Sequence, residues 1–514
     1  MPAAEASGAL AGPSRWSARW STRLGSAPWV LGALALWLLC TAWLRPLLLP
    51  DEGRYAEVAR EMLAGDGLVP LLNGLPFFHK PPLTYWVDIA GMALLGPTAL
   101  AARLGPALGG WLMGAALWLT LRHLNGPRAA GIGLLVLATS PFFFVGAQYA
   151  NHDMLVAGTI SVAVLAFAQA LAAGAPPLRW LLLGWAACGL AVLAKGLIGL
   201  VLPALIIAPW LLAQGRWRDL LRALHPAALA LFVLIALPWF VLMQQRYPGF
   251  FDYFIVEQHF RRFATAGFNN VQPGWFLLAV LPLLTLPWSL TLPLALRQLW
   301  TQRRLSAQGT WTALLLWWLV VVLGFFSLPA SKLVGYVLPA LAPWSLLLAA
   351  PLLNSRGWRP LALIGVLMCL AAVFALAWTA PKSNRDIGRF LREHVAPGDL
   401  VVMLDKGFND VQFEARLAQP PLVASRWDDP QIARFDNWRK ELADTIRFDP
   451  ARAAELLVPI DRLAALRCRG QRLWFVTEAG HAKLLAEVPG AALALQGRHA
   501  QLWRAEAQRC PHPG

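Results

Sequence analysis

The chain has 514 residues, of which 58% are hydrophobic and only 14% charged, and its formal net charge is +16. A soluble domain carries roughly 25% charged residues, so this composition excludes a protein whose main solvent is water. The basic residues are scattered between apolar stretches and do not gather on one soluble face, so we expect no nucleic-acid partner.

Apolar stretches recur from residue 28 to residue 380. Because a helix needs roughly 20 residues to cross a bilayer, we expect a bundle of about 11–13 transmembrane helices. The expected crossings are residues 29–49, 104–121, 130–147, 154–173, 180–194, 197–213, 227–243, 275–296, 311–328, 334–350 and 361–378. The shorter apolar stretch 83–95 is expected to lie at the outer surface.

Basic residues alternate with these crossings. Starting with the N-terminus inside, every inside loop carries arginine, as the positive-inside rule requires. These residues are Arg15, Arg19, Arg23, Arg122, Arg128, Arg179, Arg216, Arg218, Arg222, Arg297, Arg303, Arg304, Arg356 and Arg359. The first apolar run could also be read as a signal peptide, but no A-x-A-like cleavage site precedes Asp51.

The composition becomes that of a soluble domain after residue 380. Short apolar runs at 400–404 and 473–476 alternate with charged, amphipathic segments, which predicts a small α/β domain on the outside. The expected organisation is a cytoplasmic segment 1–27, a membrane domain 28–380 and an outer domain 381–514.

Some residues of the outer domain carry smaller predictions. A disulfide between Cys468 and Cys510 is compatible with an oxidising compartment. The default interpretation of the loop carboxylates is that they are solvated turn residues. These carboxylates are Asp405, Asp410, Asp428 and Asp429.

The outside connections between crossings hold ionisable and polar side chains. They are Asp51, Glu52, His79, Lys80, Asn151, His152, Asp153, Lys195, Ser331 and Lys332. Charges at a membrane boundary are costly, so their recurrence on one face indicates a functional site, with scattered snorkelling anchors as the alternative.

Seven sequence segments carry a family resemblance. In chain order they are DEGRYAEVAREML at 51–63, NGLPFFHKPPLTYW at 73–86, NHDML at 151–155, AKGLIGLVLP at 194–203, FDYFIVEQHFRRF at 251–263, QPGWF at 272–276 and FFSLPASKLVGYVLP at 325–339. Together they resemble the aminoarabinose lipid A transferases of the protein O-mannosyltransferase-like superfamily. The resemblance covers residues 28 to 350.

The resemblance implies the C-type membrane glycosyltransferase fold, in a multi-pass protein of the bacterial inner membrane with a periplasmic active site and C-terminal domain. It implies transfer of a pentose or hexose from a polyprenyl-phosphate donor, such as undecaprenyl phosphate, to lipid A, another glycolipid or protein. The bilayer, the donor and the acceptor are then the expected partners.

Such a transfer must hold a departing phosphate and, for a hydroxyl acceptor, accept a proton. Lys80 is the first candidate for the phosphate, because Pro81 and Pro82 restrict the backbone just beyond it. An interfacial anchor is the alternative for Lys80. The other candidates are Lys332, Lys195, Arg261 and Arg262.

Carboxylates are the candidates for accepting the proton of a hydroxyl acceptor. By resemblance, Asp51 and Asp153 come together as catalytic residues, with Asp51 as base or sugar ligand and Asp153 in support. If the acceptor is itself a phosphate, no base is needed and Asp51 orients the amino sugar. A helix N-cap is the alternative for Asp51. The expected supporting residues are Glu52, Arg54, Tyr55, Tyr85 and Glu257.

A divalent metal is a further expectation of the same region. His79 and His259, together with Glu257, could bind one, although their spacing is no metal signature and interfacial hydrogen bonding is the alternative. Asn269 and Asn270 depart from the family pattern, which leaves the sugar and the acceptor open.

Two other classes of protein stay open. A lipid or sugar transporter or flippase also explains a multi-pass chain with charges on one face, but it would more often show an internal repeat. A scaffold protein would not need Asp51, Lys80 or Asp153 at all.

Overall fold

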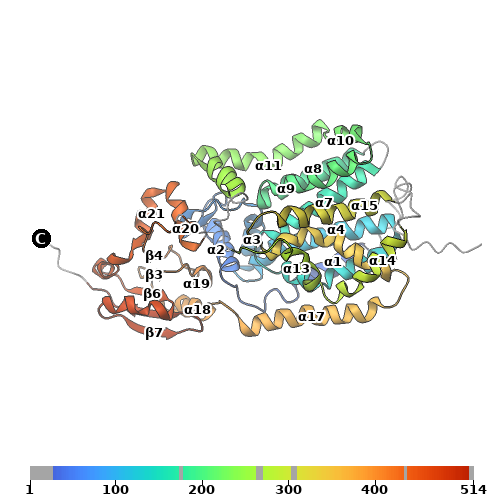
Figure 1. The fold of residues 1–514 in the computed structure, drawn as a ribbon. Coiled ribbons are helices and arrows are strands. Elements are labelled where there is room, and N and C mark those ends of the chain that lie inside the picture. The colour runs from blue at the N-terminus through green and yellow to red at the C-terminus, as the bar shows by residue number, and fades with distance from the viewer. Residues whose placement is uncertain are drawn as a thin grey trace, which may run out of the picture. The chain divides into compact units, whose positions relative to one another are not determined.

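The computed structural model describes residues 27–172, 177–261, 270–302, 309–432, 434 and 437–508. The chain forms two compact units (Figure 1). The helical unit comprises Met1–Ala42, Gly105–Leu242 and Asn270–Ala375, and the α/β unit comprises Trp43–Leu104, Met243–Asn269 and Leu376–Gly514.

Helices make up the described part of the helical unit, and some run into the α/β unit. In chain order they are α1 (Ala27–Leu39), α4 (Leu104–Leu124), α5 (Gly126–Ala138), α6 (Pro141–Gly146), α7 (Asp153–Ala172), α8 (Leu178–Lys195), α9 (Ile198–Leu212), α10 (Trp217–Ala223), α11 (Pro226–Arg246), α13 (Phe276–Leu284), η4 (Trp288–Thr291), α14 (Leu292–Gln302), α15 (Gly309–Ser327), η5 (Val334–Ala340), α16 (Leu341–Ala349), η6 (Ala350–Leu352) and α17 (Trp358–Thr379).

Among the described residues, six helices are long and apolar enough to cross a membrane, or seven if one pair bent by 104° counts as a single span. Each expected crossing contains helix, but several are shorter than expected. The first ends at Leu39, and the third breaks after Ala138 before a new helix starts at Pro141. The expected multi-pass helical bundle is confirmed, while the number of crossings stays a prediction.

Glycines bring α4 and α7 into backbone contact. A Cβ on Gly158 would lie 2.1 Å from the carbonyl oxygen of Gly109, and one on Gly109 would lie 2.3 Å from the carbonyl oxygen of Met154. Small residues permit such close approach of membrane helices. The contact fixes the first turns of α7, which begins at Asp153.

The α/β unit combines short helices with two sheets. Its elements are α2 (Asp51–Ala64), β1 (Leu71–Leu72), β2 (Leu75–Pro76), α3 (Leu83–Leu95), η2 (Ala101–Arg103), η3 (Asp252–Arg261), α18 (Arg385–His394), β3 (Leu400–Leu404), α19 (Asn409–Ala415), β4 (Leu422–Ser425), α20 (Trp438–Ala443), η7 (Asp444–Arg447), α21 (Pro450–Leu456), β5 (Leu457–Pro459), η8 (Ile460–Arg462), η9 (Ala464–Arg469), β6 (Leu473–Thr477), η10 (Ala479–Glu487), β7 (Ala492–Gln496) and β8 (Gln501–Ala505).

The larger sheet has the strand order β5-β4-β3-β6-β8-β7. Strands β3 to β6 are parallel, and β8 and β7 add an antiparallel edge. Val402 of β3 pairs with Leu422 on one side and Phe475 on the other, and all three are buried. Both apolar runs expected as strands are strands, which confirms the small α/β domain at the C-terminus.

The division into units differs from the expected one in two segments. The structure has a boundary after Ala375, near the expected one at 380, but it also groups Trp43–Leu104 and Met243–Asn269 with the C-terminal sheet. Helix α2 packs on α19, where a Cβ on Gly53 would lie 2.8 Å from the backbone nitrogen of Asp410. Glycine at this position therefore lets the segment Trp43–Leu104 pack against the later part of the chain.

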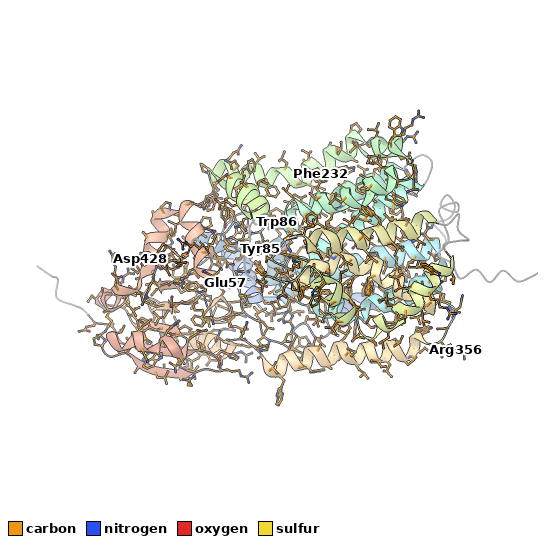
Figure 2. The ribbon with its side chains drawn as sticks, in the orientation of Figure 1. Glu57, Tyr85, Trp86, Phe232, Arg356 and Asp428 are labelled. Carbon is orange, nitrogen blue, oxygen red and sulfur yellow. The ribbon has the colours of Figure 1, made fainter. Side chains whose placement is uncertain are left out.

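Asp410 corrects one prediction about the outer domain. It is no solvated turn residue, because it is 1% exposed within α19 and accepts hydrogen bonds from the backbone and side chain of Asn384. Burial raises the pKa of Asp410 to about 7. Asp428 is exposed, as expected (Figure 2). Cys468 is disulfide-bonded, whereas its expected partner Cys510 lies outside the described residues.

Candidate functional site

The candidate residues fall into two groups, one in each unit. Asp51, Lys80 and their neighbours lie in the α/β unit, and Asp153, Lys195 and Lys332 lie in the helical unit. The expected approach of Asp51 to Asp153 stays a prediction, and each group is described by itself.

Asp51 is the first residue of α2 and pairs with a residue one turn later. Its Oδ1 accepts a hydrogen bond of 2.7 Å from Nη2 of Arg54, whose guanidinium also pairs with Glu441 of α20. The N-cap interpretation of Asp51 is wrong, since the cap residue is Pro50 and no side chain caps the helix. Asp51 stays 35% exposed while Arg54 is largely buried, so the carboxylate is the accessible member of the pair.

Two tyrosines continue this group. The Arg54 guanidinium donates to the hydroxyl of Tyr55 at 3.2 Å and lies 4.7 Å from its ring centre. The rings of Tyr55 and Tyr85 have their centres 6.3 Å apart. Successive contacts thus join four of the expected residues, which are Asp51, Arg54, Tyr55 and Tyr85.

Glu52 turns away from this group into a buried ion network. Nε of Arg103 donates to Oε1 of Glu52 at 3.0 Å, and Arg45 pairs with the same carboxylate. Burial alone would raise the pKa of Glu52, but the two arginine charges lower it to about 2. Arg103 also donates to the backbone carbonyls of Arg45 and Pro46 at 2.9 Å. The network therefore fixes the chain that leads into α2, which supports Asp51 indirectly.

A tight hairpin positions the segment that carries Lys80. Asn73 and Gly74 connect β1 and β2 with φ angles of +57° and +69°. Positive φ at both central residues defines the type I′ turn that Asn-Gly favours. Glu61 of α2 accepts the backbone N–H groups of both residues at 2.9 and 2.8 Å, so the hairpin is anchored to the helix that begins at Asp51.

Aromatic packing holds the residues just before Lys80. The ring of His79 stacks on Phe77 with 4.5 Å between centres, and Phe78 packs edge-on against Phe250 and Phe448 at 5.0 and 4.9 Å. His79 is 7% exposed. Lys80 follows this buried cluster and is itself half-buried. Its backbone is therefore fixed on both sides, by the cluster before it and by the two prolines after it.

The remaining expected residues of this unit belong to η3. Glu257 accepts a hydrogen bond of 3.0 Å from Arg447, whose guanidinium lies 4.9 Å from the ring centre of Tyr253. Arg261 ends η3. The side chains of Arg261 and His259 and the whole of Arg262 lie outside the described residues.

The metal expectation finds no ligand set in the part of the chain that the structure describes. No group of three His, Cys, Asp or Glu side chains there could hold a metal ion. Glu257 is engaged by Arg447, and His79 is stacked on Phe77. A metal at His79 and His259 stays untested, and the mechanism proposed below uses only side chains of the chain.

In the helical unit, Asp153 and Lys195 form an ion pair between the first residue of α7 and the last residue of α8. Asn151 donates to Oδ2 of Asp153 at 3.1 Å. The Lys195 ammonium lies 4.9 Å from the ring centre of Tyr336. A Cβ on Gly335 would lie 2.2 Å from Oδ2 of Asp153, so glycine is needed for this approach.

Lys332 is 4% exposed and holds a loop together. Its ammonium donates to the carbonyl oxygens of Gln272 and Pro329 at 2.8 and 2.6 Å. The backbones of the same two segments pair through Val271 and Ser331. Lys332 thus fastens the QPGWF segment to the SKLVGY segment, and its role at a donor phosphate stays a prediction.

Sequence reasoning missed four residues of these groups. They are Arg45, Arg103, Tyr336 and Glu441. Arg45 lies within the expected crossing 29–49 and Arg103 directly before the one at 104–121, positions at which an arginine is unusual in a membrane protein. Glu441 carries no local signal, since its partner Arg54 lies 387 residues earlier.

Comparison with known proteins agrees with the motifs. A family model described as dolichyl-phosphate-mannose-protein mannosyltransferase matches residues 47–254. The chain is 36% identical over 342 residues to the undecaprenyl phosphate-alpha-4-amino-4-deoxy-L-arabinose arabinosyl transferase of Edwardsiella ictaluri, covering 65% of this chain and 61% of that one. A protein of the same name from Pseudomonas fluorescens, numbered 2, is 35% identical, with 70% of this chain and 65% of that one covered. The matched part is therefore less than two thirds of these relatives' length.

Solved structures agree on the fold. The crystal structure of ArnT from Cupriavidus metallidurans bound to undecaprenyl phosphate aligns with a TM-score of 0.80 at 23% identity, covering 95% of this chain and all of that one. The apo structure of the same protein gives a TM-score of 0.76. The resemblance predicted from the motifs is confirmed: the chain is similar to the undecaprenyl phosphate-aminoarabinose arabinosyl transferases, and it has the C-type membrane glycosyltransferase fold.

Proposed function

We propose that the chain is a membrane glycosyltransferase that moves a sugar from a polyprenyl-phosphate donor to lipid A or a related glycolipid. The observation that carries the proposal is the 35–36% identity to proteins named as undecaprenyl phosphate-aminoarabinose arabinosyl transferases. The family model covers the segment from residue 47 to residue 254, which includes Asp51, Lys80, Asp153 and Lys195.

The reaction breaks the bond between the anomeric carbon of the sugar and the donor phosphate oxygen. The phosphate leaves with the bonding electron pair, and an acceptor oxygen forms the new bond to carbon. A cation at the leaving oxygen stabilises the charge that develops there. Lys80 suits this task, because the aromatic cluster and two prolines fix its backbone while its side chain is only half-buried.

The two carboxylates have different surroundings and so different tasks. Asp153 is held by Lys195 and Asn151, which suits a group that positions a substrate. Asp51 is 35% exposed and held on one side only, by Arg54. If the acceptor is a hydroxyl, Asp51 takes its proton; if it is a phosphate, the nucleophile is already ionised and Asp51 binds the sugar.

The proposal also includes the membrane in which the chain lies and the side on which the reaction takes place. The arginine-bearing loops support a cytoplasmic N-terminus in a bacterial cell, and the chemistry would then lie on the periplasmic side of the inner membrane. The C-terminal sheet would share that side. The donor, the glycolipid acceptor and the bilayer are the proposed partners.

The test is transfer of labelled sugar from an undecaprenyl-phosphate donor to a lipid A fraction, with the full chain in proteoliposomes. Asp51→Asn and Lys80→Ala are compared with Asp428→Asn and Lys483→Ala, which alter exposed residues of the same charges. We expect Lys80→Ala to lose transfer, Asp51→Asn to lower it to a degree that depends on the acceptor, and both controls to retain it. Transfer that is absent from the wild type, with labelled donor moving across the bilayer instead, would favour the flippase.

A further inference from the structure

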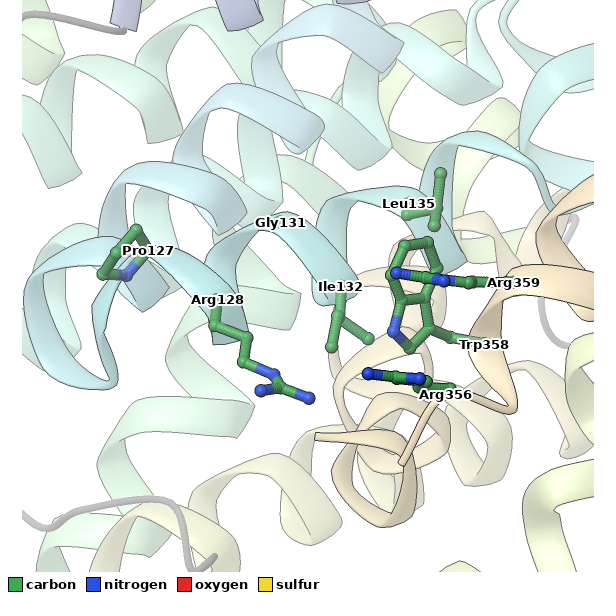
Figure 3. A pocket seen from close by; sticks show the side chains of 8 residues that line it. All are labelled: Pro127, Arg128, Gly131, Ile132, Leu135, Arg356, Trp358 and Arg359. Atoms are coloured by element: carbon green, nitrogen blue, oxygen red, sulfur yellow. The ribbon is translucent and has the colours of Figure 1, made fainter. Parts of the chain in front are cut away.

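An open cavity of about 560 Å³ lies in the helical unit, apart from all the motif residues. Figure 3 shows it between α5, from Pro127 to Leu135, and the start of α17 with the residues just before it. It is lined by Pro127, Arg128, Gly131, Ile132, Leu135, Arg356, Trp358 and Arg359. Three of these eight side chains are guanidinium groups and none is acidic.

The three arginines have no counter-charge in the part of the chain that the structure describes. Arg128, Arg356 and Arg359 are exposed, and none of them forms an ion pair with a described carboxylate. Arg359 lies over the ring of Trp358, 5.5 Å from its centre. Three like charges around one hollow repel each other, so an anion placed among them is attracted by all three.

The backbone adds to this charge. Helix α5 begins at Gly126 and α17 begins at Trp358, so both present their N-terminal ends at the cavity. The helix dipole places partial positive charge at such an end. Pro127 and Pro360 supply no N–H group there and Arg359 donates its own to Arg356, so the dipole and the remaining first N–H groups make up the backbone contribution. Phosphate groups commonly bind at such ends. The dipoles and the arginines therefore favour the same kind of ligand.

A close contact between α17 and the end of α5 holds the two walls of the cavity in place. A Cβ on Gly365 of α17 would lie 2.6 Å from the carbonyl oxygen of Thr139, which follows α5. Trp288 donates to the Thr139 hydroxyl at 2.9 Å and is fully buried. Because this contact joins α17 to the end of α5, the hollow between their first turns does not depend on mobile side chains alone.

The apolar surface next to the cavity decides between a lipid and a free anion. Beyond Arg359, α17 exposes Leu363, Ile364 and Leu367 by 63%, 45% and 57%. In a multi-pass membrane protein such a surface meets acyl chains. A phospholipid could therefore place its phosphate among the arginines and its acyl chains along α17. Free phosphate could contact only the arginines.

We propose that this cavity binds the phosphate head group of an anionic phospholipid. On the topology proposed above, the cavity opens toward the cytoplasmic leaflet, where basic pockets between helices bind anionic head groups. The site is separate from the transfer reaction, since it includes none of the residues that match the family motifs.

The test measures lipid retention by native mass spectrometry of the purified full chain, after incubation with phosphatidylglycerol, phosphatidylethanolamine or inorganic phosphate. We expect the wild type to retain phosphatidylglycerol and the double variant Arg128→Gln/Arg356→Gln to bind it at least about tenfold more weakly. Arg218→Gln is the matched control, since Arg218 is also exposed and lies over a neighbouring Trp217 ring at 5.4 Å. The control should bind as the wild type does.

Two further arms keep the outcome clear. Arg128→Lys/Arg356→Lys keeps both charges and should retain most binding, which separates loss of charge from loss of fold. Equal retention of phosphatidylglycerol by the double Gln variant and the wild type would overturn the proposal. It would also fail if the wild type retained inorganic phosphate as strongly as phosphatidylglycerol at matched concentration, because the site would then bind a free anion.

Discussion

Asp153 at the start of α7 is ion-paired with Lys195 at the end of α8, 42 residues later. Two motifs of the family resemblance, NHDML and AKGLIGLVLP, thus meet in one contact. Each side chain is mostly buried, at 11% and 17% exposure, so each neutralises a charge that would be costly alone. The pair therefore acts as one unit, and substitution of either member should disturb the other.

A double-mutant cycle tests this coupling. We expect Asp153→Asn and Lys195→Met each to lower sugar transfer, and the double variant to be no slower than the slower single variant. Groups in direct contact show coupling energies of about 0.5–3 kcal/mol. The measurement is the initial rate of transfer at equal amounts of folded protein in proteoliposomes.

The control cycle uses Asp153→Asn with Lys483→Ala, whose side chain is exposed in the other unit. That cycle should be additive. If the Asp153 and Lys195 effects were also additive, the ion pair would have no part in transfer and the two residues would act separately.

Asp51 should matter differently for different acceptors. Asp51→Asn removes the charge but keeps the shape and the contact with Arg54. With a hydroxyl acceptor we expect transfer to fall by about 10²-fold or more, the usual loss when a general base is removed. With a phosphate acceptor no base is needed, so the loss should be far smaller and appear mainly in KM. A loss of equal size with both acceptors would assign Asp51 to sugar binding and not to proton transfer.

Hydrophobic patterning predicted most of the fold. Helices were found where uniform apolar runs predicted them, and β3 and β6 were found where short apolar runs lie between polar segments. Helix breaks were missed, as at Ala138 and Pro141, because composition does not show where a helix bends. The joining of α2 to α19 was also missed. It depends on a glycine contact across some 350 residues of sequence, which no local pattern reveals.

The candidate site was predictable where family motifs exist. They identified Asp51, Arg54, Tyr55 and Tyr85, and the structure joins these four residues. The motifs gave no information on the residues elsewhere in the chain that pair with them. Glu441, which binds Arg54, lies in the C-terminal domain, where we found no interpretable motif.

The hairpin before Lys80 offers a test of how that lysine is positioned. Gly74 has a φ of +69°, and a Cβ there would lie 2.7 Å from Cγ of Pro420; Gly67 has a φ of +70° with nothing near its Cβ position. Gly67→Ala should cost about 1 kcal/mol from backbone strain alone. Gly74→Ala adds the clash, so it should destabilise the chain more and lower transfer. Equal thermal stability and transfer in the two variants would show that the hairpin does not position Lys80.

Glu52 provides the clearest dependence on pH. Its pKa is about 2 in the folded chain, against an ordinary value of 4.5. A lowered pKa means that the ionised form is favoured by folding, so the stabilisation is complete above pH 4.5 and is lost as the pH falls toward 2. We therefore expect acid to lower the thermal unfolding temperature of the wild type across this window.

Substitution of Glu52 separates this contribution from general acid unfolding. Glu52→Gln removes the carboxylate that pairs with Arg45 and Arg103, and breaking a buried ion pair typically costs about 3–5 kcal/mol. The variant should unfold at lower temperature at pH 7 and lose less than the wild type between pH 4.5 and 3. Glu506→Gln, an exposed acid paired with Arg504, should change stability by no more than about 0.5 kcal/mol. Parallel pH profiles for the wild type and Glu52→Gln would exclude Glu52 as the titrating group, because the profile of the variant contains every carboxylate but this one.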